Sequence, residues 1–147
     1  MNIVFSTGKN FPLKARLMRF AQKVCGAVPV LNKDGEICCV FVSDDKIQKI
    51  NKTFLNHDDA TDVIAFGYPK NSGPAFGDIY ISVDTARRMA QRGGYPLAQE
   101  LALMLAHGLL HLAGYDDLVP AKKKKMFAKQ NALFKKIDPG LAPPDCV

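Results

Sequence analysis

The most constraining feature of the sequence is a stretch that is apolar on nearly every side and carries two histidines near its end. Pro96 can open a helix there, and the residues up to Ala113 are mostly Leu, Ala and Met. A helix of this kind must be buried, and polar side chains on it need partners. His107 and His111 are one helical turn apart, so both imidazoles project from one face and can bind a single metal ion. The stretch predicts a buried central helix with a metal site at its C-terminal end.

The residues after this helix offer a third ligand. Gly114 can adopt a positive φ and end the helix, so that the chain turns back and brings Asp117 to the histidines. Asp116 is the alternative carboxylate, and the spacing favours Asp117. Three protein ligands leave one position for water, which is typical of a catalytic zinc site. Glu100 lies on the same helical stripe as His107, two turns earlier, and is a candidate to support the ligands.

The full pattern, H-x-x-x-H-x-x-G-x-x-D, matches the metzincin layout H-E-x-x-H-x-x-G-x-x-H with two changes. An isolated histidine pair also occurs on surfaces or in hydrogen-bonded pairs, so the extended pattern carries the metal prediction. Asp117 replaces the third histidine, and a carboxylate oxygen is an acceptable zinc ligand. Gly108 replaces the glutamate that serves zinc peptidases as general base, which disfavours peptide hydrolysis. Water on the metal, with its pKa lowered towards about 7, could still act as nucleophile, for instance on a phosphodiester. No side chain is assigned as a catalytic group.

Length and composition predict one domain over residues 1–147. Hydrophobic residues make up 48% and charged residues 23% of the chain, so a folded core is expected. No apolar run reaches the roughly 20 residues of a membrane helix, and the N-terminus lacks the pattern of a signal peptide. We therefore expect a cytoplasmic protein without a membrane partner. The four cysteines form no C-x-x-C pair and fit reduced thiols in that compartment.

Basic residues are concentrated near both ends of the chain. Residues 1–33 hold six basic side chains and no acid, and residues 118–147 hold seven lysines against two aspartates. Residues 34–117 hold twelve acids against seven bases. This distribution fits a polyanionic partner whose backbone passes over the metal site. Ordinary solvated helix faces are the alternative explanation, also for the run from Lys122 to Lys125.

The hydrophobic periodicity predicts an α+β fold, an α/β sandwich in which a small mixed, mainly antiparallel sheet packs with about five helices. Helices are expected at about 12–25, 44–54, 83–92, 96–113 and 121–137. Strands are expected at 2–5, 28–31, 36–42, 61–66 and 76–82. Asn32 to Gly35 is expected to be a hairpin turn, and residues 138–147, rich in proline, an irregular tail.

The segment from His107 to Asp117 resembles the signature H-G-x-L-H-L-x-G-Y-D-H of the YbeY family of bacterial endoribonucleases and rRNA maturation factors. Three other stretches agree with family motifs in the expected order: those that begin at Asn51, Thr61 and Gly77 resemble N-x-x-[FY], T-D-V-L-S-F and G-D-I-x-I-S. Two single positions agree as well, Glu100 and Met126. Four ordered motifs make the resemblance specific over about residues 51–130.

The resemblance implies zinc bound at His107, His111 and Asp117, and cleavage of single-stranded RNA. It also implies a role in maturing 16S rRNA, especially its 3′ end, and in ribosome quality control, with the small ribosomal subunit as partner. Another divalent metal is possible, because two histidines and a carboxylate also suit ferrous iron. Asp62 joins Glu100 as a candidate to support the ligands. The candidate RNA-binding side chains are Lys14, Arg16, Arg19, Lys23, Lys52, Lys122 and Lys123.

Two positions depart from the family pattern. Asp117 stands where a third histidine is usual, and Leu55 stands where many members have an arginine that is thought to bind or cleave RNA. These departures concern the metal preference and the rate of cleavage more than the fold. Two other functions stay open: a ribosome-associated RNA-binding factor with a mainly structural metal, and, disfavoured by Gly108, a zinc peptidase. No oligomeric state is predicted.

Overall fold

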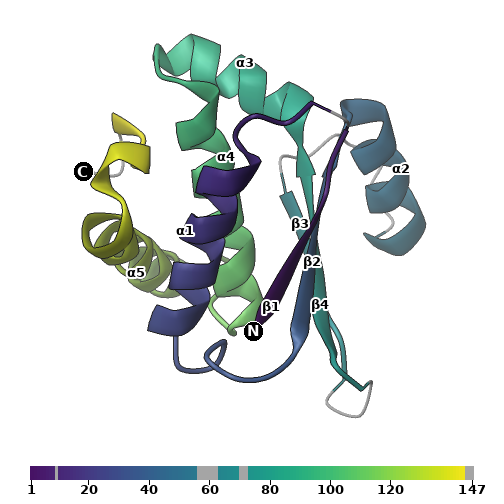
Figure 1. Cartoon of the computed structure of the whole chain (residues 1–147), viewed down its shortest axis with the longest axis vertical. Helices are drawn as coiled ribbons and strands as arrows, with labels where there is room; N and C mark the ends of the chain where they lie inside the picture. The colour runs from purple at the N-terminus through teal and green to yellow at the C-terminus, as the bar shows by residue number, and fades with distance from the viewer. Residues whose placement is uncertain (9, 56–62, 70–72, 145–147) are drawn as a thin grey trace.

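In the computed structural model, which describes residues 1–8, 10–55, 63–69 and 73–144, a four-stranded sheet lies among five α-helices (Figure 1). The strands are β1 (Asn2–Ser6), β2 (Glu36–Val42), β3 (Val63–Gly67) and β4 (Ala75–Ser82). The helices are α1 (Lys14–Ala27), α2 (Asp44–Leu55), α3 (Val83–Gly93), α4 (Leu97–Leu112) and α5 (Pro120–Ile137). The predicted α+β fold is confirmed.

The sheet is mixed but mainly parallel, with the strand order β1-β2-β4-β3. β1 and β4 both pair with β2 in parallel, and β3 pairs antiparallel with β4. The prediction of a mainly antiparallel sheet is therefore wrong. The cause is the segment 28–31, which forms turns after α1 instead of a strand, with Val28 and Leu31 buried. Without a hairpin there, α1 is the crossover from β1 to β2, and a helical crossover joins parallel strands.

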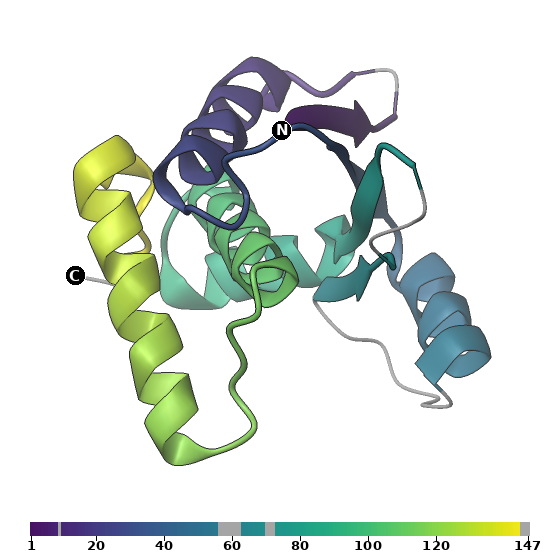
Figure 2. The same ribbon diagram turned by 90° about the horizontal axis from the view of Figure 1, so that it is seen from below.

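Helix α4 is the centre of the hydrophobic core. α1 and α4 cover one face of the sheet with α5 packed outside them, whereas α2 covers part of the other face (Figures 1 and 2). Leu101, Leu105 and Leu109 of α4 are fully buried. The helix extends to within a residue of the predicted limits, which confirms the prediction of a buried central helix.

The described part of the predicted irregular tail contains more order than expected. Pro139–Leu141 forms one turn of 3-10 helix, and Leu141 is buried in the core. Arg16 on α1 forms an ion pair of 3.2 Å with Asp138, which joins the end of α5 to α1. Among the described residues, no helix has both the length and the apolar character that crossing a bilayer requires.

Candidate metal centre

The end of α4 is a Schellman motif centred on Gly114. The backbone N–H of Tyr115 donates to the carbonyl of Leu110, and the N–H of Gly114 donates to the carbonyl of His111. Each of these hydrogen bonds has a donor–acceptor distance of 3.0 Å. Gly114 has a φ of 100°, a backbone angle that residues with a Cβ rarely adopt. The chain therefore reverses at this glycine, as the sequence predicts, and the residues after it run back along the helix end.

This reversal brings the three predicted ligands together. The Nε2 atoms of His107 and His111 lie 3.0 Å apart, and the rings are nearly perpendicular. The carboxylate of Asp117 approaches Nε2 of His107 to 3.5 Å and Nε2 of His111 to 4.0 Å. The imidazoles are half-buried and the carboxylate is exposed. The three residues form a group that could hold a metal ion.

The spacing of these atoms fits a small divalent ion. One ligand atom from each of the three residues lies within 4.8 Å of the others. Tetrahedral ligands that are 2.0–2.2 Å from zinc lie about 3.3–3.6 Å from one another. The closest approaches of 3.0, 3.5 and 4.0 Å bracket this range. Small side-chain adjustments therefore suffice to complete the coordination.

The hydrogen bond of the His111 ring determines which nitrogen can bind a metal. Its Nδ1 lies 3.0 Å from the carbonyl oxygen of Tyr115. A carbonyl oxygen can only accept, so Nδ1 carries the proton and donates. The neutral ring then has its lone pair on Nε2, the atom that faces His107 and Asp117. This contact was not predicted from the sequence, although Gly114, which ends the helix, was the signal for it.

The alternative ligand Asp116 has different partners. One of its oxygens accepts a hydrogen bond from the backbone N–H of Leu118, and the other lies 3.4 Å from Nζ of Lys122. These contacts connect the loop to the start of α5. The geometry therefore favours Asp117 as the third ligand and gives Asp116 a role in loop structure.

Gly108, at the position of the peptidase glutamate, lies against the sheet. A Cβ at this position would be 2.8 Å from Cγ2 of Ile79 on β4, which is too close without a shift of one of them. The absence of a side chain lets α4 approach β4 closely. A glutamate here would point towards the sheet, so the structure explains why this site has no carboxylate beside the first histidine.

Of the two residues predicted to support the ligands, Glu100 lies away from the histidines and Asp62 lies outside the described residues. The buried carboxylate of Glu100 accepts a hydrogen bond from the hydroxyl of Tyr95. This contact is near the start of α4, roughly 10 Å along the axis from His107 at 1.5 Å per residue. Asp62 and the side chain of Leu55 lie outside what the structure describes.

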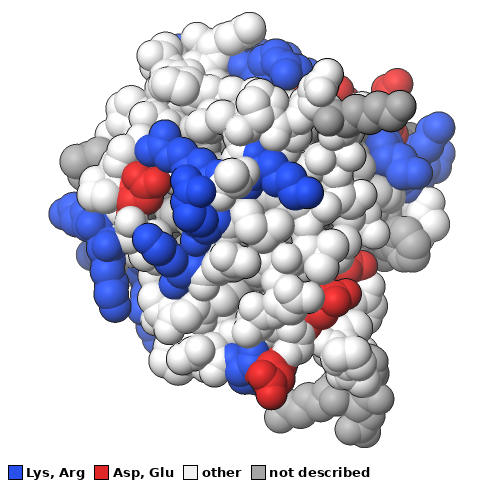
Figure 3. Space-filling view, viewed as in Figure 1, with Lys and Arg blue, Asp and Glu red and all other residues white. Residues whose placement is uncertain are grey.

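The predicted basic residues lie on several surfaces. Lys14, Arg16, Arg19 and Lys23 are exposed on α1, and Figure 3 shows basic side chains gathered over this helix. α1 and the loop that follows α4 lie on opposite sides of α4 (Figure 2). Lys52 is exposed in the last turn of α2. Lys122 and Lys123 are in the first turn of α5, directly after the ligand loop, and the Lys123 ammonium lies 5.6 Å from the ring centroid of Phe127.

The buried central helix, the reversed loop and the group of two histidines and an aspartate define an α+β protein whose candidate metal ligands have a metzincin-like arrangement. The family model described as Endoribonuclease YbeY matches residues 5–138. The chain therefore belongs to the YbeY endoribonuclease family, which confirms the resemblance seen in the sequence.

Individual relatives agree with this assignment. The chain is 41% identical over 110 residues to a protein of Elusimicrobium minutum, with 72% of this chain and 77% of the relative covered. It is 36% identical over 134 residues to a protein of Chlorobaculum parvum, with 91% and 93% covered. Both are described as Endoribonuclease YbeY. The solution structure of TM1509 from Thermotoga maritima matches with a TM-score of 0.66 and 27% identity, over 93% of this chain and 89% of that one.

Proposed function

We propose that this protein is a zinc-dependent endoribonuclease, specific for single strands, that matures the 3′ end of 16S rRNA and takes part in ribosome quality control. The observation that carries the proposal is the convergence of His107, His111 and Asp117 at the end of α4 in a chain of the YbeY endoribonuclease family. The proposed partners are rRNA and the small ribosomal subunit, and the proposed location is the cytoplasm.

The residues of the chain would have distinct tasks at this site. His107 and His111 would each bind the metal through Nε2, with His111 oriented by the carbonyl of Tyr115. Asp117 would add a negatively charged oxygen ligand, which also suits ferrous iron. A bound zinc ion would supply Lewis acidity towards the phosphodiester and lower the pKa of a water molecule.

The position of Gly108 supports a nuclease over a peptidase. The Cβ direction at this residue leads to Ile79, so the chain has no carboxylate in the place where zinc peptidases have their general base. We propose no other side chain for that role. Electrostatic stabilisation of a phosphodiester does not need this glutamate, whereas the usual peptidase mechanism does.

The basic residues would bind the RNA at two distances from the metal. Lys122 and Lys123 follow the ligand loop directly and would contact the strand close to the cleavage site. The four cations of α1 lie on the other side of α4, so they would contact a distant part of a long RNA or of the ribosomal subunit. Lys52 is proposed as a further RNA contact on α2.

Cleavage assays on matched RNA substrates test the proposal. Wild-type protein should cut a labelled single strand and spare the duplex of the same sequence. His111→Ala should lower kcat/KM at least about 100-fold, because a ligand is lost. Added zinc should restore activity to metal-depleted wild type and not to the variant. Lys135→Ala, an exposed change at the far end of α5, is the control.

The same assays separate the nuclease from the alternative functions. Retention of full activity by metal-depleted protein or by His111→Ala would overturn the proposal. An RNA-binding factor with a structural metal would bind RNA without cutting it and would lose thermal stability when the metal is removed.

A further inference from the structure

A pocket of about 300 Å³ lies beside the metal ligands, between the loop after α4 and the first turns of α5. It is lined by Ala113, Gly114, Tyr115, Asp116, Lys122 and Lys125. None of these residues supplies a metal-binding side chain. The pocket is therefore a separate feature, and its function is not accounted for by the metal site.

The wall between the pocket and the metal ligands is a single stretch of backbone. Asp116 faces the pocket and Lys122, whereas Asp117, the next residue, faces the histidines. Consecutive Cα atoms are about 3.8 Å apart. Tyr115 also belongs to both features, since it lines the pocket and its carbonyl contacts His111. A strand that places one phosphate at the metal ligands has a neighbouring group within reach of the pocket.

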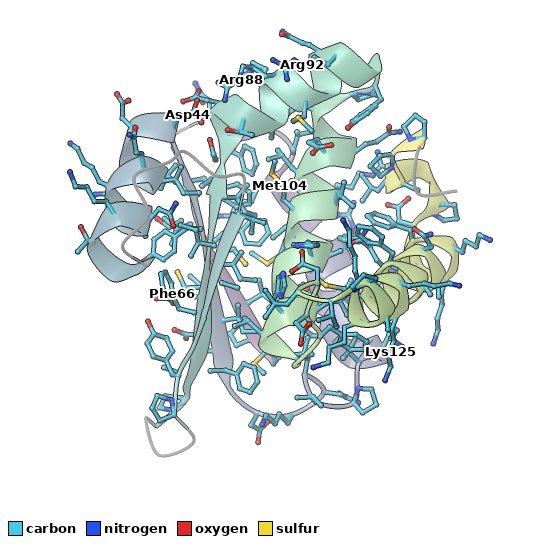
Figure 4. The ribbon with its side chains drawn as sticks, turned by 180° about the vertical axis from the view of Figure 1, so that it is seen from behind. Asp44, Phe66, Arg88, Arg92, Met104 and Lys125 are labelled. Carbon is cyan, nitrogen blue, oxygen red and sulfur yellow. The ribbon has the colours of Figure 1, made fainter. Side chains whose placement is uncertain are left out.

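The pocket carries an excess of positive charge. Lys122 is paired with Asp116 at 3.4 Å, and its side chain is still 65% exposed. Lys125, one turn further along α5, makes no ion pair or hydrogen bond with any residue that the structure describes. It lies in the N-terminal half of α5 (Figure 4) and lines the pocket together with residues of the loop after α4. Two ammonium groups against one carboxylate leave one positive charge for a ligand.

We propose that this pocket binds a backbone phosphate of the RNA strand, next to the one that is cleaved, with Lys125 as the main contact and Lys122 held in place by Asp116. The inference rests on the proposed nuclease function. Lysine is a compact point charge that binds phosphate without a fixed angular geometry. An RNA strand carries a negatively charged phosphate at every nucleotide, so a strand at the metal ligands has further phosphates on either side.

The salt dependence of RNA binding tests the contact without relying on cleavage. Binding of a labelled 12-nucleotide single strand to metal-depleted protein is measured by fluorescence anisotropy. Lys125→Ala should reduce the slope of log K against log salt by about 0.7, the value for one phosphate contact in a single strand. Between 50 and 200 mM salt, the wild type should thus lose about 2.6-fold more affinity than the variant. Lys135→Ala, on the same helix, should leave the slope unchanged.

A neutral methylphosphonate linkage, moved along the RNA, identifies the phosphate concerned. At one position beside the cleavage site, it should weaken wild-type binding about as much as Lys125→Ala does. The same linkage should cause no further loss in Lys125→Ala, because the contact is already absent. With unmodified RNA, the variant should raise KM several-fold and change kcat less than two-fold.

An unchanged salt slope in Lys125→Ala, or the absence of any position coupled to Lys125, would overturn the pocket proposal. If the wild type cleaves RNA and the variant is unaffected, only the pocket proposal fails. If the wild type cleaves no RNA, the nuclease proposal fails, and the salt slope still decides whether the pocket binds a phosphate. Melting temperatures of the variants exclude misfolding as the cause.

Discussion

The Nδ1 atom of His111 lies 3.0 Å from the carbonyl oxygen of Tyr115, four residues later in the chain. The contact exists because α4 ends at Gly114 and the chain reverses there. The same turn ends the helix, selects the tautomer of His111 and brings Asp117 to the ligand group. The backbone geometry at one glycine therefore determines how the three candidate metal ligands are arranged.

Replacement of Gly114 by alanine should damage both the fold and the site. A φ of 100° is strained for a residue with a Cβ, so we expect a loss of about 1–2 kcal/mol in unfolding free energy. Zinc affinity should fall about 10- to 100-fold, because the hydrogen bond that orients His111 is disturbed. Urea unfolding and zinc titration against a chelator measure the two effects. Gly26→Ala is the control, because a Cβ at this position on α1 would have no atom within 4 Å, and it should leave zinc binding unchanged. Equal zinc affinities in both variants would contradict the coupling between the turn at Gly114 and the ligands.

Gly108→Ala should destabilise the protein by about 1–3 kcal/mol, because the new methyl group meets Ile79 at 2.8 Å. Ile79 is fully buried, so Ile79→Ala alone should cost about 2–5 kcal/mol. In the double variant the methyl group enters the space that Ile79 leaves. We therefore expect a combined loss at least about 1 kcal/mol below the sum, measured by urea unfolding. Strict additivity would show that the two residues do not compete for space.

Asp117→Asn and Asp116→Asn form a matched pair of adjacent changes. Asp117→Asn removes the charged ligand, so zinc affinity should fall at least about 100-fold. Asp116→Asn should change it less than about 3-fold, because that carboxylate contacts Lys122 and the backbone of Leu118. Equilibrium dialysis with elemental analysis measures the bound zinc. A larger loss in the Asp116 variant would reverse the ligand assignment.

Asp44 should make the stability of the protein pH-dependent. Its carboxylate accepts hydrogen bonds from Arg88 at 2.6 Å, Ser82 at 2.6 Å and Thr85 at 2.7 Å, which join α2 to α3 (Figure 4). The contact with Arg88, followed by those with the hydroxyls, lowers the pKa of Asp44 from 3.8 to about 2. Because the pKa of Asp44 is lower in the folded than in the unfolded chain, the ionised carboxylate stabilises the fold at pH values above the unfolded pKa. This contribution is lost as the pH falls towards 2.

The change Asp44→Asn tests this contribution. The urea midpoint of wild type should exceed that of the variant by a constant amount between pH 5 and pH 7. Below about pH 4 the difference should shrink, because Asp44 then takes up a proton in the unfolded wild-type chain while it stays ionised in the folded one. A difference that is independent of pH down to pH 3 would contradict the assigned ionisation.

Charge reversal on α1 should separate long from short RNA substrates. Arg19→Glu with Lys23→Glu changes two exposed cations on the side of α4 that is away from the ligand loop. Cleavage of a short single strand should be affected less than 2-fold, whereas binding of a long rRNA fragment should weaken at least 10-fold at low salt. Arg16 is left unchanged because it pairs with Asp138. Equal effects on both substrates would place the α1 cations at the cleavage site.

Local patterns were sufficient to predict most elements and the grouping of His107, His111 and Asp117 in space. The apolar stretch from 97 to 112, the histidine spacing and Gly114 all act within a few residues along the chain, and helix geometry converts such spacing directly into shared faces. The five helices and the strand Glu36–Val42 accordingly agree with the predictions. The resemblance to the YbeY family used the same local signatures.

Tertiary structure decided what depends on contacts between distant segments. The sheet direction followed from the absence of a strand at 28–31, which a short apolar run cannot reveal because buried turns have the same composition. A glycine at position 108 leaves room for the side chain of Ile79, which belongs to strand β4 and not to α4. The different surroundings of Asp116 and Asp117 come from Lys122 on α5 and from the histidines on α4, since adjacent carboxylates differ only in the side chains that three-dimensional packing brings to each.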